Sequence, residues 1–243
     1  MNPSLESNDP PGSQIPGHIT RKIALAQERQ SLPRHIAVEG PIGVGKTTLA
    51  RRLATALRYP LLLEPATENP FLNRFYLDRH SHALPTQLFF LLHRAGQIAD
   101  VPKNDLLGPT LVADFIMEKD RLFAKLTLDD EEFHLYEQIH KNLNIEPPTP
   151  DLVIYLQAPA EILQQRIHGR GIDFEQHIEP EYLRDLADCY TEFFHYYDDG
   201  PLLIVNASEI DFANNDHHFE ALLDVVIDME GTRHFFNPNP TLL

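Results

Sequence analysis

A glycine-rich segment between residues 40 and 48 carries the clearest chemical signal in the chain. It reads Gly40-Pro41-Ile42-Gly43-Val44-Gly45-Lys46-Thr47-Thr48 and fits the pattern G-x-x-x-x-G-K-[ST]. Glycines let successive N–H groups face one anion, and the positive end of a following helix adds to the attraction. Lys46 would reach the β- and γ-phosphates of a nucleoside triphosphate, and the Thr47 hydroxyl would bind Mg²⁺. The alternative is a glycine-rich turn without a ligand.

The elements around this segment favour the phosphate-binding interpretation. Apolar runs alternate with helical patterns, and we predict strands at His35–Glu39, Leu61–Glu64, Thr110–Asp114, Asp151–Gln157 and Pro201–Asn206. Strands that alternate with helices predict a parallel sheet with helices on both faces. The expected fold class is therefore α/β, of the P-loop NTPase type, with five parallel strands.

Acidic residues end two of these predicted strands. In an open parallel sheet, ligands gather at the carboxyl ends of the strands. Glu64 and Asp114 would then lie beside the triphosphate and Mg²⁺, as one candidate base and one candidate metal-side carboxylate. The alternative for each is a helix cap or a solvated charge.

A predicted helix over Pro85–Asp100 carries a second group of candidates. Gln87 and Arg94 are two turns apart and point the same way, with Phe90 between them. Such a wall could hydrogen-bond and stack on a planar heterocycle. The alternative is an ordinary solvated helix face.

Composition restricts the class of protein. The chain has 243 residues and a formal net charge of −16, with a sequence pI near 5.1, which argues against binding nucleic acid. No apolar run approaches the length of a membrane span. Cys189 is the only cysteine, which suits a reducing compartment, and we expect the cytoplasm.

The pattern also predicts how the chain is divided. Residues 1–33 are expected to be a flexible N-terminal extension with a short helix at Ile19–Gln30. Residues 34–230 would form one catalytic-type domain, and residues 231–243 an extended C-terminal tail.

Several ordered motifs together resemble the deoxynucleoside kinase family, and most nearly its bacterial deoxyadenosine and deoxyguanosine kinases. The resemblance covers about Ile36 to Phe212 and rests on Glu64-Pro65, Glu68-Asn69-Pro70-Phe71-Leu72, Phe75-Tyr76, Gln87 through Arg94, Pro150 through Gln157, Arg166 through Gly171 with Glu175, and Ile178 through Leu183. It implies a five-stranded parallel sheet with a helical lid, usually a homodimer. It also implies phosphorylation of the 5′-hydroxyl of a deoxynucleoside by ATP with Mg²⁺.

The resemblance assigns a role to individual residues. It implies that Glu64 is the general base, that Tyr76 and Glu175 bind the sugar 3′-hydroxyl, and that the lid arginines Arg166 and Arg170 neutralise the transferring phosphoryl group. The residues implied for base recognition are Gln87, Arg94, Asp120, which pairs with that arginine, and Phe123. The loop that holds the adenine of ATP would include Asp211 and Phe212. Deoxyadenosine is expected to be preferred over deoxyguanosine, since Gln87 matches the N6/N7 edge of adenine.

Two departures from the family pattern concern positive charge. Many members carry Glu-Arg-Ser after the third strand, whereas this chain has Asp114-Phe115-Ile116, and a third lid arginine is replaced by Ile172. Lys119 is a nearby substitute for the first, and its alternative is a solvated lysine.

Two other classes of function stay open at this stage. A nucleoside-monophosphate kinase, such as a thymidylate kinase, shares the phosphate loop and an arginine lid. It would need cations at the acceptor phosphate, and this chain offers glutamates there. A non-catalytic ATP-binding switch would not need Glu64.

Overall fold

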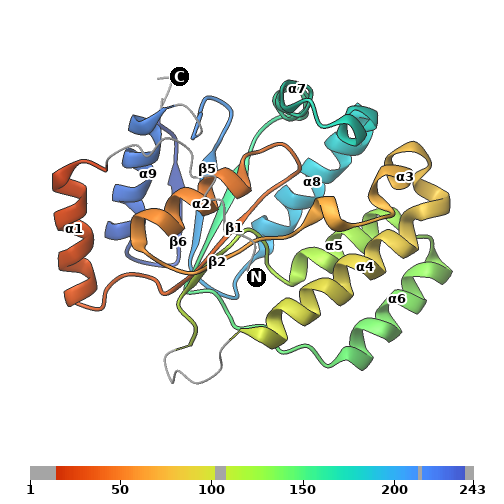
Figure 1. Ribbon diagram of the computed structural model, residues 1–243, viewed down its shortest axis with the longest axis horizontal. Helices are drawn as coiled ribbons and strands as arrows, with labels where there is room; N and C mark the ends of the chain where they lie inside the picture. Colours follow the sequence, from red (N-terminus) through yellow and green to blue (C-terminus); the bar gives the residue numbers. More distant parts are fainter. Residues whose placement is uncertain (1–14, 102–107, 213–214, 239–243) are drawn as a thin grey trace, which may run out of the picture.

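The computed structural model describes residues 15–101, 108–212 and 215–238 (Figure 1). Residues 1–14 of the expected extension and residues 239–243 of the expected tail lie outside these ranges. The helices of the described chain are α1 (Gly17–Glu28), α2 (Lys46–Leu57), α3 (Leu72–Leu77), α4 (Arg79–Asp100), α5 (Glu118–Thr127), α6 (Asp130–Leu143), α7 (Ala160–Arg170), α8 (Pro180–Tyr196) and α9 (Asp216–Asp228). Short 3-10 helices lie at η1 (Ala66–Glu68) and η2 (Asp173–His177).

The strands form one parallel sheet, as the sequence predicts. Their order is β2 (Leu61–Leu62), β3 (Leu111–Ala113), β1 (His35–Glu39), β4 (Leu152–Gln157), β5 (Leu202–Asn206) and β6 (Arg233–Phe236). This sheet has six strands in the described chain, whereas five were expected.

The sixth strand, β6, comes from the segment that was expected to be an extended tail. Leu202 of β5 is in register with Arg233, and Val205 with Phe236. The Arg233 guanidinium also donates to the Tyr197 carbonyl oxygen at 2.7 Å. Because β6 is short and none of its four residues is buried, its place in the sheet depends on backbone pairing that a hydrophobic pattern does not reveal.

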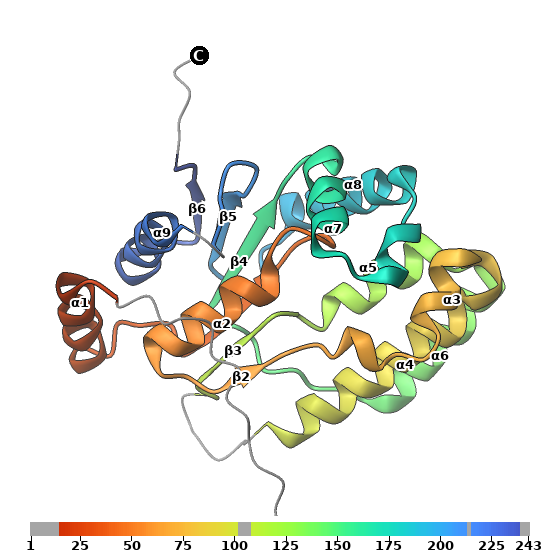
Figure 2. The same ribbon diagram turned by 45° about the horizontal axis from the view of Figure 1, so that its top comes forward.

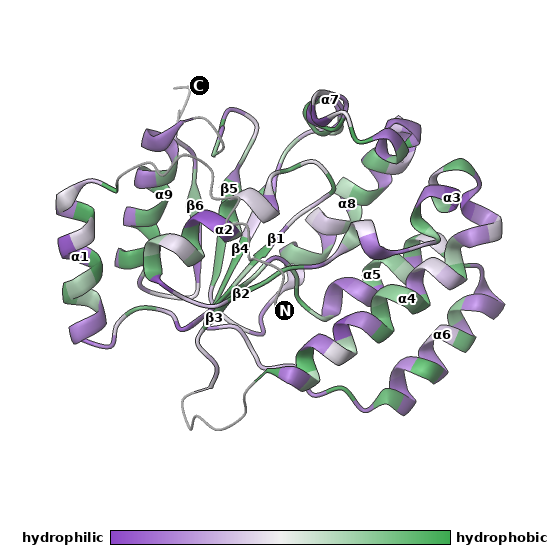
Figure 3. Ribbon diagram, in the orientation of Figure 1, coloured by the Kyte–Doolittle hydropathy of each residue, from purple (hydrophilic) through white to green (hydrophobic). Residues whose placement is uncertain are grey.

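Helices cover both faces of the sheet (Figures 1 and 2). Side chains alternate along β4, so that Leu152, Ile154 and Leu156 pack with α1, α2 and α9. Val153 and Tyr155 face the other way and pack with α5 and α8. Figure 3 shows the strands as a hydrophobic centre between helices of mixed polarity. This two-sided burial explains why the strands are almost continuously apolar.

Helix α4 is longer than the sequence predicted. It begins at Arg79 instead of Pro85, and Pro85 lies inside it. The Asp78 carboxylate caps this earlier start by accepting from the Ser81 N–H at 3.2 Å. Pro85 is the seventh residue of the helix and therefore removes one i→i−4 hydrogen bond, so Asp78 marks the helix start and Pro85 does not.

The phosphate loop follows directly from the buried strand β1. At Gly40 the backbone has φ +145°, and a Cβ atom there would lie 2.3 Å from the Leu156 carbonyl oxygen of β4. At Gly45, φ is +107°, but no atom would lie within 4 Å of an added Cβ. Glycine is therefore favoured at position 40 both by the backbone conformation and by the lack of space for a Cβ atom. At position 45 it is favoured by the backbone conformation alone.

This difference predicts unequal losses of stability. Gly40→Ala should lower the free energy of unfolding by roughly 2 to 4 kcal/mol, since strain and overlap with β4 add. Gly45→Ala is the matched control and should cost about 1 kcal/mol, because only the backbone is strained. Urea unfolding of both variants measures the two losses. Equal losses would show that the contact with β4 is unimportant.

Candidate active site

The nucleotide cleft lies at the carboxyl ends of the strands. Three segments line it: the loop and start of α2 from Gly43 to Thr48, the α7 side chains Ile162, Gln165, Arg166 and Arg170, and the segment from Ser208 to Phe212. The structure thus brings the phosphate loop together with the predicted lid arginines and with Asp211 and Phe212. Phe212 is 4% exposed, because its side chain packs in the core with α2 and α9.

Lys46 lies folded over its own loop. Its Nζ donates to the Gly40 carbonyl oxygen at 2.7 Å and to the Pro41 carbonyl oxygen at 3.1 Å. Burial and the nearby Lys119 charge lower the pKa of Lys46 to about 8, although Glu39, Asp114 and Glu64 oppose the shift. An anion in the loop would compensate the two mutually repelling ammonium groups.

The two lid arginines have different surroundings. Arg166 donates to the carbonyl oxygens of Ala207 at 2.6 Å and Ile210 at 2.9 Å, and to that of Val44 at 3.3 Å. Its guanidinium therefore ties the segment after β5 to the phosphate loop. Arg170 is 44% exposed and lies 3.5 Å from the Glu175 carboxylate.

Asp114 connects the phosphate loop with Glu64. Its Oδ2 accepts from the Thr47 hydroxyl at 2.6 Å, and its Oδ1 accepts from the Glu64 N–H at 2.7 Å. The side chain of Thr47 and the carboxylate of Asp114 supply the hard oxygen ligands that Mg²⁺ prefers. Both predicted strand-end acids thus reach the same edge of the sheet.

Glu64 is held by two cations. Its Oε1 accepts from the Arg94 guanidinium, and its Oε2 accepts from Lys119 Nζ at 2.9 Å. Burial alone would raise the pKa of Glu64, but the Arg94 and Lys119 charges outweigh it and lower the pKa to about 2. Lys119 is 4% exposed, so the interpretation of Lys119 as a solvated lysine is wrong.

Arg94 is shared between two carboxylates. It pairs with Asp120 as well as with Glu64, and both Arg94 and Asp120 are buried. The guanidinium also lies over two rings, 5.1 Å from the centre of Phe90 and 5.9 Å from that of Phe115. The pairing of Asp120 with Arg94 expected from the family resemblance is present in the structure.

A second group of side chains faces Glu64 from α3 and η2. The Tyr76 ring stacks on Phe174 with centroids 6.2 Å apart. Burial, the neighbouring Tyr182 hydroxyl and the negative charges of Glu175 and Glu64 raise the pKa of Tyr76 well above its ordinary value. Burial also raises the pKa of Glu175, against the Arg170 and Lys46 charges. Tyr76, Glu175 and Glu64 therefore lie near enough for the two carboxylates to affect the pKa of the Tyr76 hydroxyl.

The remaining predicted residues lie on α4 and α5. Gln87 is 3% exposed, and its Nε2 donates to the Thr127 hydroxyl at 3.2 Å. Phe123 packs edge-on against Tyr190 with centroids 6.1 Å apart. Gln87 and Arg94 are both buried on α4, so they do not form an ordinary solvated face.

Sequence reasoning missed Glu39. This fully buried carboxylate accepts from the Gly40 N–H at 3.0 Å, the Ile116 N–H at 2.9 Å and the Tyr190 hydroxyl at 3.0 Å. It therefore joins β1 to the segment after β3 and to α8. The one available signal was an acidic residue that ends a buried strand directly before the glycine loop.

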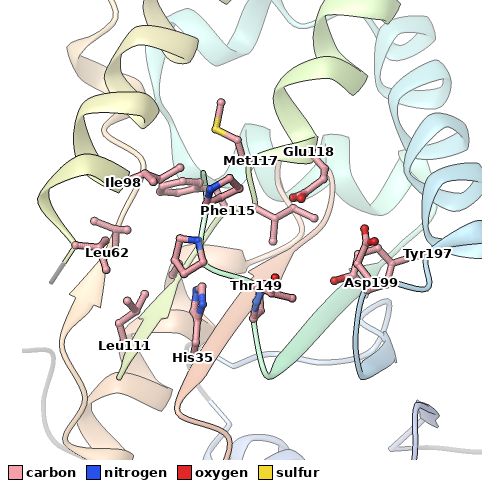
Figure 4. A pocket seen from close by; sticks show the side chains of 16 residues that line it. His35, Leu62, Ile98, Leu111, Phe115, Met117, Glu118, Thr149, Tyr197 and Asp199 are labelled. Carbon is pink, nitrogen blue, oxygen red and sulfur yellow. The ribbon is translucent and has the colours of Figure 1, made fainter. Parts of the chain in front are cut away.

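A separate cavity lies beside the sheet (Figure 4). His35, Leu111 and Thr149 line one part of it, and Phe115 and Met117 line another. Burial lowers the pKa of His35. None of the predicted site residues lines this cavity, and it shares no lining residue with the nucleotide cleft.

A phosphate-binding loop between a parallel sheet and a helical lid defines the P-loop class of fold. Comparison with known proteins narrows the class. The family described as "Deoxynucleoside kinase" matches residues 36–229. Deoxyguanosine kinase of Bacillus subtilis (strain 168) is 34% identical over 192 residues, which cover 77% of this chain and 93% of the relative. Deoxyadenosine kinase of Dictyostelium discoideum is 33% identical over 186 residues, covering 74% and 72%.

A solved structure gives the same result. Deoxyadenosine kinase from M. mycoides with bound dATP superposes with a TM-score of 0.68 at 27% identity, covering 79% of this chain and 97% of that one. The chain belongs to the deoxynucleoside kinase family and is a kinase. Among the residues that the structure describes, no helix is both long and apolar enough to cross a membrane.

The low pKa of Glu64 predicts a pH-dependent contribution to stability. Because the folded value of about 2 lies below the ordinary 4.5, the contribution is complete above the ordinary pKa and is lost as the pH falls toward 2. The gap in unfolding free energy between wild type and Glu64→Gln should stay constant above about pH 6. Below about pH 5 it should narrow, by at most about 1.4 kcal/mol per pH unit.

Urea unfolding between about pH 7 and pH 3 measures this gap. Glu131→Gln, at an exposed carboxylate of α6, corrects for the general loss of a negative charge. A gap for Glu64→Gln that is independent of pH over this range would contradict the ion pairs described above.

Proposed function

We propose that the protein transfers the γ-phosphoryl group of ATP to the 5′-hydroxyl of a deoxynucleoside. The observation that carries this proposal is the Glu64 carboxylate, which Arg94 and Lys119 hold in place. The Glu64 N–H donates to Asp114 beside the phosphate loop, and the negative charge of Glu64 helps to raise the pKa of Tyr76 on the proposed acceptor side. A hydroxyl in this space could donate to Glu64 while its oxygen faces the γ-phosphate in the loop.

The charges around the acceptor space support a neutral acceptor. Glu64 and Glu175 are both acidic, and the two cations nearest Glu64 are already paired with it. A nucleoside monophosphate would bring a further dianion to this space, at a cost from like charges. These contacts favour a hydroxyl of a nucleoside over the phosphate of a thymidylate-like acceptor.

Thr47 and Asp114 would hold Mg²⁺ with the triphosphate, since their oxygen atoms lie together beside the loop. Mg²⁺, when bound there, neutralises part of the phosphate charge. Lys46 would leave the two carbonyl groups of its own loop for phosphate oxygens. Arg170 is partly exposed at the edge of the cleft, and its guanidinium could cover the transferring group.

The low pKa of Glu64 is compatible with this chemistry. In a loose phosphoryl-transfer transition state the attacking oxygen has formed little of its new bond, so its proton leaves late. An ionised carboxylate then acts first by orienting the hydroxyl, and accepts the proton as the new bond forms. The fixed position of the Glu64 carboxylate would therefore contribute more to the rate of phosphoryl transfer than its basicity does.

We also propose deoxyadenosine as the preferred substrate, with deoxyguanosine second. The buried amide of Gln87 can offer a donor and an acceptor to the N6/N7 edge of adenine. Asp120 holds Arg94, which would otherwise favour the O6/N7 edge of guanine. The names of the relatives, deoxyguanosine kinase and deoxyadenosine kinase, support a purine without ranking the two.

A cytoplasmic homodimer completes the proposal. Leu92 of α4 is 53% exposed and Leu135 of α6 is 45% exposed, and two helices with exposed leucines suit contact with a second copy. The single cysteine, Cys189, suits a reducing compartment.

A panel of acceptors tests the function directly. Purified protein with ATP and Mg²⁺ should show its highest kcat/KM with deoxyadenosine, followed by deoxyguanosine, among the deoxynucleosides, ribonucleosides and thymidylate. Glu64→Gln should lower kcat by on the order of 10²–10⁴ and largely keep KM. A best rate with thymidylate would indicate a monophosphate kinase. No transfer to any acceptor would indicate a non-catalytic protein.

Tyr76→Phe tests the sugar pocket. Loss of the hydroxyl should weaken deoxynucleoside binding by about 1 kcal/mol, the usual net contribution of one hydrogen bond. The loss should appear in kcat/KM for both deoxyadenosine and adenosine, because both carry the 3′-hydroxyl that Tyr76 is proposed to bind. Tyr197→Phe, at a buried tyrosine of the separate cavity, is the matched control. Unchanged kcat/KM in Tyr76→Phe would remove Tyr76 from sugar recognition.

A further inference from the structure

Lys119 occupies an unfavourable place for a cation. It is the second residue of α5, where the helix dipole disfavours positive charge. Its side chain is 4% exposed, so its ammonium group has also lost most of its water. The Lys46 ammonium is close enough for the Lys119 charge to lower the pKa of Lys46. The helix dipole, the loss of water and the Lys46 charge therefore all destabilise the charged form of Lys119.

The compensation comes from Glu64. Lys119 Nζ lies 2.9 Å from Glu64 Oε2 and donates to it. Arg94 contacts the other oxygen of Glu64, but its charge is shared with Asp120. The cluster therefore holds two carboxylates and two cations, and Lys119 is the cation that serves Glu64 alone.

The two contacts fix the carboxylate from different helices. Arg94 reaches Oε1 from α4, and Lys119 reaches Oε2 from α5. The Phe123 ring, one turn further along α5, has its centre 5.8 Å from Lys119 Nζ and packs beside the ammonium group. With one oxygen held from each side, rotation of the carboxylate about its own axis breaks one of the bonds.

Among the described residues that follow β3, Lys119 is the one whose cationic side chain pairs with Glu64. The residue after Asp114 is Phe115, whose ring lies with Ile98 and Met117 at the separate cavity (Figure 4). Phe115 thus fills apolar space on the side of α4. The first cationic side chain after β3 that contacts Glu64 is Lys119.

We propose that Lys119 is a positioning residue for phosphoryl transfer, which holds the Glu64 carboxylate in the orientation that accepts the hydrogen bond of the substrate hydroxyl. The inference rests on the proposed function, since it assigns Lys119 a role only through Glu64. Lys119 itself need not touch the substrate. In this chain Lys119 supplies a positive charge near the end of β3, where many family members have an arginine and this chain has Phe115.

The test compares Lys119→Met with Lys119→Arg. Methionine keeps an unbranched chain without charge, and kcat should fall about tenfold to a hundredfold with KM for the deoxynucleoside little changed. The acid limb of the kcat/KM profile should move upward by about 1 pH unit or more, because Glu64 loses a cation. Arginine should restore most of kcat and of the acid limb. Lys125→Met, at an exposed position of the same helix, is the control.

Further measurements keep the outcomes distinct. Circular dichroism and thermal unfolding report whether each variant folds, and Lys119→Gln takes the place of Lys119→Met if that variant does not. A fall in kcat with an unmoved acid limb and no rescue by arginine would overturn the inference and leave a structural role. Wild-type kcat in Lys119→Met would also overturn it. Full activity of Glu64→Gln would instead show that Glu64 is not the general base. Failure of the proposed function can thus be told apart from failure of the role proposed for Lys119.

Discussion

Two carboxylates and two cations are paired inside the protein, and the geometry of the site depends on them. Glu64, Asp120, Arg94 and Lys119 contact one another with little exposure to water. Loss of one member would leave a buried charge without compensation, so each depends on the others. Apolar side chains of the same volume could hold the segments as firmly. What they could not do is orient a carboxylate, and this orientation is the specific contribution of the cluster.

Hydrogen bonds connect this cluster of charged residues to the phosphate loop. The Glu64 N–H donates to Asp114, and the other oxygen of Asp114 accepts from Thr47 at the start of α2. Glu39 joins the loop to the segment after β3 through the N–H groups of Gly40 and Ile116. The donor and acceptor sides of the cleft are therefore connected by short polar contacts. The position of the Glu64 backbone is thus connected through Asp114 to that of Thr47.

The sequence predicted the parts of this arrangement that depend on local pattern. The phosphate loop was recognisable because its glycines and Lys46 lie between a buried strand and a helix, and the strand-end rule brought Glu64 and Asp114 to one edge. Contacts between distant segments were not predictable in the same way. The partners of Glu39 and Lys119 lie on other elements, and β6 depends on pairing with β5. The resemblance implied that Arg166 neutralises the phosphoryl group, and this stays a prediction. The structure adds contacts that the sequence did not predict, between the Arg166 guanidinium and backbone carbonyls of the segment after β5.

In the proposed function, Arg94 would link substrate recognition to the chemistry. It lies on the same helix as Gln87 and bonds both Asp120, on the side proposed for the base, and Glu64, on the side proposed for proton acceptance. A nucleobase that draws Asp120 or Arg94 toward itself must change the hydrogen bonds that hold Glu64. In an interior of low effective dielectric constant, the electrostatic effect of such a change on the Glu64 carboxylate is screened less than it would be in water. Discrimination between bases should then appear in kcat as well as in KM, because one guanidinium takes part in both tasks.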